Sequence, residues 1–111
     1  MSKYGNRKIH TPDGTFDSVK EFRRWQELKL LERAGEIGNL HRQTPFGLIP
    51  PQRVNGKLVE RGVTYYADFT YITKDGKFVV EDVKSPATRT QVFRIKRKLM
   101  LQVHGIQIVE V

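Results

Sequence analysis

The stretch Thr64–Lys84, TYYADFTYITKDGKFVVEDVK, decides the fold of this chain. Residues 64–73 and 77–84 are rich in β-branched and aromatic side chains, which favour strands. The turn-forming sequence Lys74-Asp75-Gly76 separates the two runs. The stretch therefore predicts an antiparallel hairpin.

The length of the turn decides which side chains share a face of this hairpin. A three-residue loop with Gly76 in the left-handed conformation places Asp68 opposite Asp82. A two-residue turn places Asp68 opposite Val83 instead, on the face away from Asp82. Only the first register brings both carboxylates within reach of one divalent cation, because directly opposed residues have Cβ atoms about 5 Å apart.

Three residues of the hairpin are candidates for chemistry. Asp68 interrupts a run of β-branched and aromatic residues, where Asp is disfavoured, and strand alternation places Asp82 and Lys84 on one face. Each has an ordinary explanation as well. Asp68 fits a solvent-facing position, and an Asp-x-Lys sequence alone is typical of an exposed, salt-bridged strand.

Upstream of the hairpin, residues 7–16 predict a small hairpin around a Pro-Asp-Gly turn, and residues 18–34 predict a helix that stops at Gly35. Ser18 and Glu21 match a capping box at the start of that helix. Glu21 therefore has two interpretations: a partner of the cap, or an acid that enters a metal site from the helix.

The sequence signals for the remaining elements are weak before the hairpin and clear after it. Residues 40–48 predict a strand broken near Pro45. Residues 89–103 predict a second helix that stops at Gly105, and residues 106–111 predict a closing strand. The expected apolar stripe of the second helix consists of Val92, Ile95, Leu99 and Val103.

Lys96 lies at the centre of the expected apolar stripe, between Val92 and Val103. Lysines in such a place usually extend their ammonium group to solvent. The functional alternative is a contact between Lys96 and a substrate phosphate.

Composition restricts the classes of function. The chain has 111 residues, which we expect to form one domain (1–111), with residues 1–8 as a flexible basic arm. A net charge of +8 predicts a polyanionic partner such as DNA or RNA. Without Cys, and with three scattered His, any metal would be held mainly by carboxylates, which favours Mg²⁺ or Mn²⁺. No long apolar run or signal peptide is present, so we expect no membrane association and a cytoplasmic location.

The order of elements predicts an α/β sandwich with a mixed central sheet. The segments FDSVKEFRRWQEL, YYADFTY, GKFVVEDVKS, TRTQVFRIKRKLM and GIQIVEV, in this order, resemble small phage and prophage proteins of the PD-(D/E)XK nuclease superfamily. The resemblance covers about residues 3–111. It implies a restriction-endonuclease-like α/β/α fold with an αβββαβ core, and a host-cytoplasmic location for a phage protein. Two departures concern the backbone near the motifs: Ala67 replaces the superfamily's Pro, and Ser85 stands where Gly is expected.

The resemblance also implies a role for each candidate residue. Asp68, Asp82, the Val83 carbonyl and Glu21 would hold Mg²⁺, with Mn²⁺ as a substitute. Lys84 would position the attacking water or stabilise charge on the phosphate, and Lys96 would assist. The implied activity is an endonuclease that hydrolyses DNA phosphodiester bonds in phage replication, recombination or packaging. Its substrate is left open between branched or junction DNA, a flap, duplex ends and a specific site. A resolvase of this kind would be expected to act as a homodimer, since it cuts two strands.

Basic residues on the two predicted helices would contact backbone phosphates. They also fit an ordinary solvated helix surface. The candidates are Arg23, Arg24, Arg89, Arg94, Arg97 and Lys98.

Two rival functions follow from the same residues. The first is a nucleic-acid-binding module of the same fold that does not cut. The second is a protein–protein adaptor that uses the aromatic strand at Tyr65, Tyr66, Phe69 and Tyr71. Strand alternation places Tyr65, Phe69 and Tyr71 on the face away from Asp68, where core packing explains them more simply.

Overall fold

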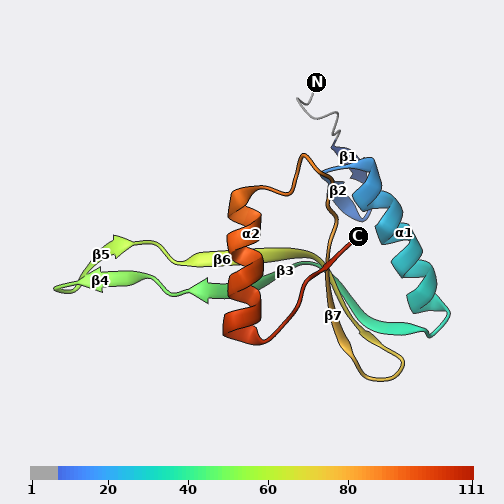
Figure 1. The fold of residues 1–111 in the computed structure, drawn as a ribbon. Coiled ribbons are helices and arrows are strands. Elements are labelled where there is room, and N and C mark those ends of the chain that lie inside the picture. Colours follow the sequence, from blue (N-terminus) through green and yellow to red (C-terminus); the bar gives the residue numbers. More distant parts are fainter. Residues whose placement is uncertain (1–7) are drawn as a thin grey trace.

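The computed structural model describes residues 8–111, so residues 1–7 of the expected basic arm lie outside the described residues. The described chain contains two helices, a π-helical turn and eight strands (Figure 1). In chain order they are β1 Ile9–Thr11, β2 Gly14–Phe16, α1 Val19–Arg33, β3 Ile37–Ile49, β4 Gln52–Val54, β5 Lys57–Glu60, β6 Val63–Thr73, β7 Phe78–Asp82, α2 Gln91–Leu99, η1 Met100–His104 and β8 Val109–Glu110.

The main sheet has four strands in the order β3-β6-β7-β8. The β3–β6 and β6–β7 pairs are antiparallel, whereas β7 and β8 are parallel, so the sheet is mixed. With the small hairpins β1–β2 and β4–β5 set aside, the chain follows the predicted αβββαβ order. The architecture is therefore mixed α/β.

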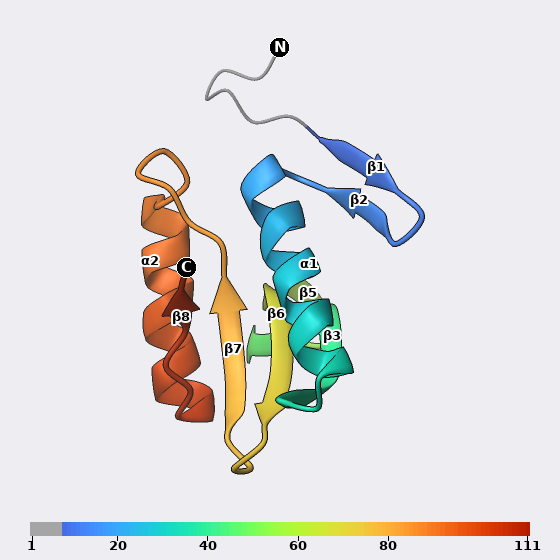
Figure 2. The ribbon, with the colours of Figure 1, turned by 90° about the vertical axis from the view of Figure 1, so that its right-hand side faces the viewer.

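The two helices pack on opposite faces of this sheet. Val79 and Val83 pack against the buried cluster that contains Leu28 of α1, whereas Val80 lies in the cluster that contains Phe93 of α2. Alternate residues of a strand point to opposite faces, so α1 and α2 cover different sides. Figure 2 shows β6 and β7 between the two helices.

The register of the β6–β7 hairpin matches the three-residue loop. Phe69 pairs with Glu81 and Ile72 pairs with Phe78, which places Asp68 opposite Asp82 at the next position. Gly76 has a φ of 89°, the left-handed conformation that the loop requires. The predicted register is confirmed, and the alternative with Asp68 opposite Val83 is not present.

The predicted break of the strand near Pro45 is wrong. β3 runs without interruption through Pro45, which pairs with Tyr66. Its position at the edge of the sheet explains the tolerance, because an edge strand can direct the side that lacks an N–H away from its neighbour.

The β3–β6 ribbon bends at Gln43 and Asp68. Gln43 has a φ of 50°, which is unusual for a strand residue other than glycine. Before the bend, Tyr65 packs in the α2-side cluster; after it, Phe69 and Tyr71 pack in the α1-side cluster. The prediction that Tyr65 shares a face with Phe69 and Tyr71 is therefore wrong, because simple alternation does not continue through the bend.

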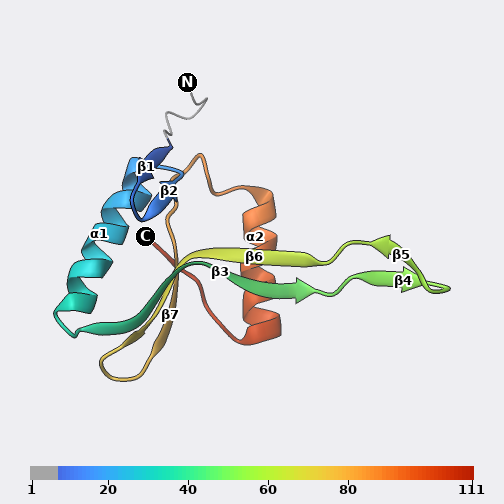
Figure 3. The same ribbon diagram turned by 180° about the vertical axis from the view of Figure 1, so that it is seen from behind.

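The β4–β5 hairpin was not predicted. Val54 pairs with Lys57 across Asn55 and Gly56, whose φ angles are 51° and 79°. This geometry is typical of an Asn-Gly hairpin turn, so the dipeptide was a usable signal. The hairpin extends from the end of the β3–β6 ribbon, away from both helices (Figures 1 and 3).

Both helices begin and end close to the predicted positions. Ser18 caps α1, and Gly35 follows it with a φ of 79°. α2 and η1 together cover the predicted second helix, and Gly105 ends them with a φ of 66°. No helix in residues 8–111 is long and apolar enough to span a membrane.

The predicted apolar stripe of the second helix is wrong for three of its four residues, since only Leu99 packs against the core. Val92, Ile95 and Val103 are 61%, 52% and 49% exposed, whereas Phe93 and Met100 are buried against the sheet. Phe93 and Met100 lie seven residues apart, on one side of the helix, and their larger side chains fill the space above the sheet.

Candidate active site

A cleft of about 520 Å³ opens between the start of α1, the bend of β3 and β6, the end of β7 and the start of α2. It brings together all the predicted catalytic and metal-ligating residues, although they come from distant parts of the chain. The lining includes Glu21, Asp68, Asp82, Val83, Lys84 and Lys96.

Glu21 takes part both in the helix cap and in the cleft. Ser18 Oγ accepts a hydrogen bond of 3.1 Å from the Glu21 N–H, and Glu21 Oε2 accepts one of 2.8 Å from the Asp17 N–H. The second oxygen, Oε1, lies 3.4 Å from Gln43 Nε2. Glu21 is only 3% exposed. The two interpretations of Glu21 are therefore compatible, since each oxygen has a different neighbour.

Asp68 is half-buried at the bend of β6. Its Oδ2 accepts a hydrogen bond of 2.8 Å from the Val83 N–H. Burial, followed by the negative charges of Asp82 and Glu21, raises the pKa of Asp68 to about 8. The three carboxylates therefore repel one another across the cleft, and a proton or a cation would relieve this repulsion.

Asp82 and Lys84 form an ion pair at the end of β7. Lys84 Nζ lies 3.0 Å from Asp82 Oδ1, and the Tyr65 hydroxyl donates to Asp82 Oδ2. Lys84 Nζ also lies 3.9 Å from the centroid of the Phe93 ring, a cation–π distance. The ammonium group is thus held at the cleft by a carboxylate on one side and an aromatic face on the other.

Gln43 is a site residue that the sequence analysis missed. Its Nε2 lies 3.4 Å from Glu21 Oε1 and 3.4 Å from Asp68 Oδ1. The amide therefore bridges the acid of α1 and the acid of β6. The sequence did not indicate a role for Gln43, because Gln43 precedes the expected strand break at Pro45. Only the β3–β6 register shows that Gln43 faces Asp68.

Two further lysines line the cleft through contacts with backbone carbonyls. Lys96 Nζ donates to the Thr64 carbonyl over 3.1 Å, and Lys20 Nζ donates to the Lys84 carbonyl over 2.6 Å. Lys96 therefore lies where the sequence predicted it, at the cleft. Lys20 was not predicted, and it joins α1 to the segment that carries Lys84.

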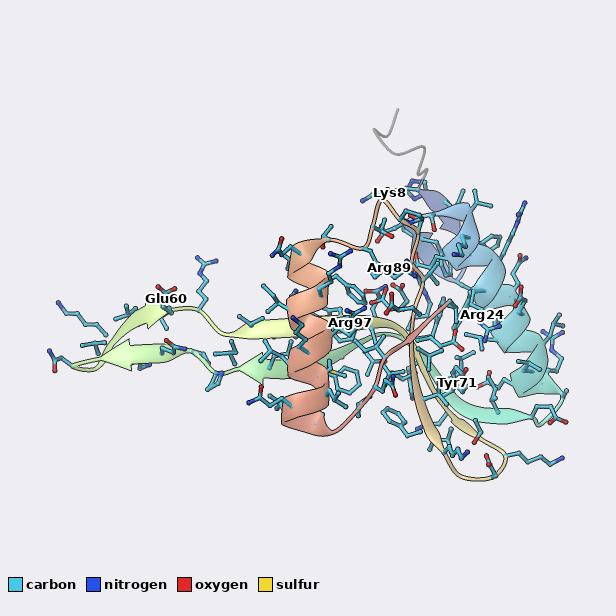
Figure 4. The ribbon with its side chains drawn as sticks, in the orientation of Figure 1. Lys8, Arg24, Glu60, Tyr71, Arg89 and Arg97 are labelled. Atoms are coloured by element: carbon cyan, nitrogen blue, oxygen red, sulfur yellow. The ribbon has the colours of Figure 1, made fainter. Side chains whose placement is uncertain are left out.

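The basic residues predicted to contact phosphates fall into two groups. Arg24, Arg89 and Arg97 form ion pairs with carboxylates. Arg89 Nε and Arg97 Nη1 lie 2.7 and 2.9 Å from Glu110 of β8, and the Arg89 bond is the main reason that the pKa of Glu110 is lowered (Figure 4). The second group is exposed and consists of Arg23, Arg94 and Lys98.

The oxygen atoms of these carboxylates are the ligand type that a hard divalent cation such as Mg²⁺ prefers. The described part of the chain does not, however, supply a complete set of ligands. Within residues 8–111, no three His, Asp or Glu side chains form a group that could hold a metal ion by themselves. Mg²⁺ is usually held by one or two carboxylates, and water and substrate phosphate oxygens complete its shell. Asp68 and Asp82 supply such a pair, at a place where negative charge is only partly compensated.

Comparison with known proteins places the chain in a family. The family model described as "Protein of unknown function (DUF1064)" matches residues 1–108, so the chain belongs to this family. No curated protein and no solved structure matches the chain.

Proposed function

We propose that this member of the DUF1064 family is a metal-dependent endonuclease that hydrolyses DNA phosphodiester bonds, and that its mixed α/β fold is restriction-endonuclease-like. The observation that carries the proposal is the pairing of Asp68 and Asp82 on neighbouring strands beside Lys84. Two acids and a lysine at one end of a sheet suit phosphodiester hydrolysis, because the reaction needs a bound cation and a positive group near the phosphate.

Electrostatics supports a cation at this place. The neighbours of the Glu21 and Asp68 carboxylates are backbone N–H groups and the Gln43 amide, which are neutral donors. Such donors offset little of the repulsion that raises the pKa of Asp68 to about 8. A divalent cation between Asp68 and Asp82 would convert this repulsion into binding energy.

The chain's own residues would divide the work as follows. Asp68, Asp82 and the Val83 carbonyl would hold Mg²⁺, or Mn²⁺ in its place, with Glu21 completing the set. The bound ion would polarise the phosphate and lower the pKa of a water molecule. Lys84 would release Asp82 and donate to the attacking water or to a phosphate oxygen. Gln43 would keep Glu21 and Asp68 in position.

The substrate is proposed to be DNA, with branched or junction DNA as the preferred form and a homodimer as the active species. The supporting features are the net charge of +8 and the exposed cations Arg23, Arg94 and Lys98. Such cations bind phosphates with little regard to base sequence. A nuclease that selects DNA by shape needs this kind of contact.

The test is a cleavage assay with branched, flapped, linear duplex and single-stranded DNA. We expect cutting of at least one substrate in Mg²⁺ or Mn²⁺, and none in EDTA. Asp82→Asn should lower the rate by a factor of about 10³ or more, because it removes a metal ligand. Asp75→Asn is the matched control, since it changes an exposed acid in the β6–β7 turn and should cut like wild type. Cleavage that survives EDTA or Asp82→Asn would contradict the assignment.

A nucleic-acid-binding module without cleavage is the second candidate. It is favoured by the ion pair that occupies Asp82 and by the lack of a three-acid group in the described chain. In this case the wild-type protein would bind DNA equally well in Mg²⁺ and in EDTA, and would leave every substrate intact.

A further inference from the structure

The segment Pro50–Gly62, called here the arm, contributes no residue to the lining of the cleft. It contains the β4–β5 hairpin and its flanks, and each of its residues is exposed. Figure 4 shows the side chains around Glu60 standing clear of the rest of the molecule.

The arm exposes apolar side chains that belong to neither hydrophobic cluster of residues 8–111. Val54, Leu58 and Val59 are 58%, 51% and 56% exposed. A two-stranded hairpin is only marginally stable by itself in water, and apolar residues add to its stability only when they are covered. The arm therefore has the character of a surface that is completed by binding.

Charge indicates which class of partner completes it. Arg53, Lys57 and Arg61 carry three positive charges on the arm, against one negative charge at Glu60. The whole chain is also strongly basic, with a net charge of +8. A polyanion matches this surface better than a second copy of the chain, because two basic arms would repel each other.

The arm and the cleft are parts of one ribbon. β3 and β6 carry Gln43 and Asp68 at their centre, and they continue into the arm at their far end. Gly56 at the tip lies twelve positions before Asp68 in the chain. At about 3.3 Å per residue, the tip can lie up to about 40 Å from the cleft. One turn of B-form DNA is about 34–36 Å long, so a duplex that binds at the cleft can also pass along the arm.

We propose that the arm binds in the groove of duplex DNA, about one helical turn from the phosphate that occupies the cleft. The major groove admits a two-stranded β-ribbon, its phosphate borders suit Arg53 and Lys57, and its floor offers apolar contacts such as thymine methyl groups. This inference rests on the proposed function, and it adds that the substrate includes at least one turn of intact duplex beside the cleavage site.

The test measures binding without cleavage, by fluorescence anisotropy in EDTA between 50 and 200 mM salt. The arm variant is Arg53→Ala/Lys57→Ala. The matched control is Lys74→Ala/Lys77→Ala, which removes the same charge from another exposed hairpin turn. On a 30-base-pair duplex, we expect the slope of log K against log salt to fall by about 1.8 in the arm variant, at about 0.9 for each phosphate contact. On an 8-base-pair duplex closed by a loop, which is shorter than one helical turn of about 10 base pairs, the arm variant and the control should behave alike.

The other outcomes would contradict the inference, and they separate a failure of the arm proposal from a failure of the proposed nuclease function. Equal slopes for the two variants on the long duplex would show that the arm touches no DNA, whereas cation-dependent cleavage by wild type would leave the proposed function intact. A change from dimer to monomer in sedimentation, with unchanged DNA binding, would assign the arm to contacts between copies. A wild-type protein that binds and cuts no DNA would end both proposals.

Discussion

Glu81 and Asp82 are neighbours in β7, yet their carboxylates lie in opposite environments. Glu81 is 1% exposed and forms a two-pronged ion pair with Arg24 of α1, at 2.8 and 2.7 Å, and it also accepts from the Tyr71 hydroxyl (Figure 4). Burial and this hydrogen bond raise the pKa of Tyr71 to about 12. The bond to Glu81 is also the main reason that the pKa of Arg24 lies above its ordinary value.

On the other face, Asp82 pairs with the Lys84 ammonium group, and burial together with the negative charges of Asp82 and Glu21 raises the pKa of Asp68. The difference shows how to separate structural acids from functional ones. A buried acid with a matching guanidinium is complete and fastens α1 to the sheet. Glu21 and Asp68 have only neutral hydrogen-bond donors and other carboxylates as their described partners, and we infer that this pair binds a cation.

The largest expected effect on stability concerns the ion pair between Arg24 and Glu81. Arg24→Leu should lower the free energy of unfolding by about 3–5 kcal/mol, because it leaves the Glu81 carboxylate buried without its cation. Urea denaturation measures this change. Arg23→Leu is the control, since Arg23 is exposed on the same helix and should change stability by less than about 0.5 kcal/mol. A loss below about 1 kcal/mol for Arg24→Leu would show that the ion pair is not structural.

Among the acids of the cleft, Asp68 offers the next test: Asp68→Asn should stabilise the protein at high pH in EDTA. The folded-state pKa of Asp68 is raised from 3.8 to about 8, so between these values the folded state holds a proton that the unfolded state has lost. The contribution of Asp68 to stability is therefore present below about pH 4 and is lost as the pH rises to about 8. Asn retains an oxygen for the Val83 N–H without the charge.

The measurement is the free energy of unfolding of both proteins at pH 4, 6 and 9. We expect the advantage of Asp68→Asn to grow by at least about 1 kcal/mol over this range, after allowance for solvent screening. Asp75→Asn should show no such gain, because a hydrogen bond from Thr73 lowers the pKa of Asp75. Parallel curves for wild type and Asp68→Asn would contradict the repulsion that we assign to the cleft.

The smallest effect concerns Gln43, which bridges two of the cleft's acids. Gln43→Ala and Gln43→Gly both remove the amide and should lower cleavage about tenfold, because Glu21 and Asp68 lose their shared donor. Glycine adopts a φ of 50° without strain, so Gln43→Gly should be more stable than Gln43→Ala by about 1 kcal/mol. Paired cleavage and unfolding measurements separate the two roles. Wild-type cleavage by both variants would remove Gln43 from the site.

The sequence predicted the parts of the molecule that depend on local signals. Gly76 determines the loop, and the loop determines the register of Asp68 and Asp82. Ser18 and Gly35 determine the limits of α1. These features were predictable because each depends on a few neighbouring residues, whose turn or capping geometry is nearly fixed.

The sequence did not predict what depends on contacts between distant elements. Pro45 lies within a strand only because β3 is at the edge of the sheet. Phe93 and Met100 pack against the sheet and so determine which face of α2 is buried. The number of apolar residues on each face does not determine it. Gln43 entered the site through pairing across β3 and β6, and the ion pair between Arg24 and Glu81 joins residues 57 positions apart.

The most direct test of the central claim is a calorimetric titration with Mn²⁺. We expect saturable binding to wild type, loss of that binding in Asp68→Asn/Asp82→Asn, and wild-type binding in Asp75→Asn, which alters an exposed acid outside the cleft. Identical binding by wild type and the double variant, or no saturable binding by wild type with or without a short DNA duplex, would contradict the claim.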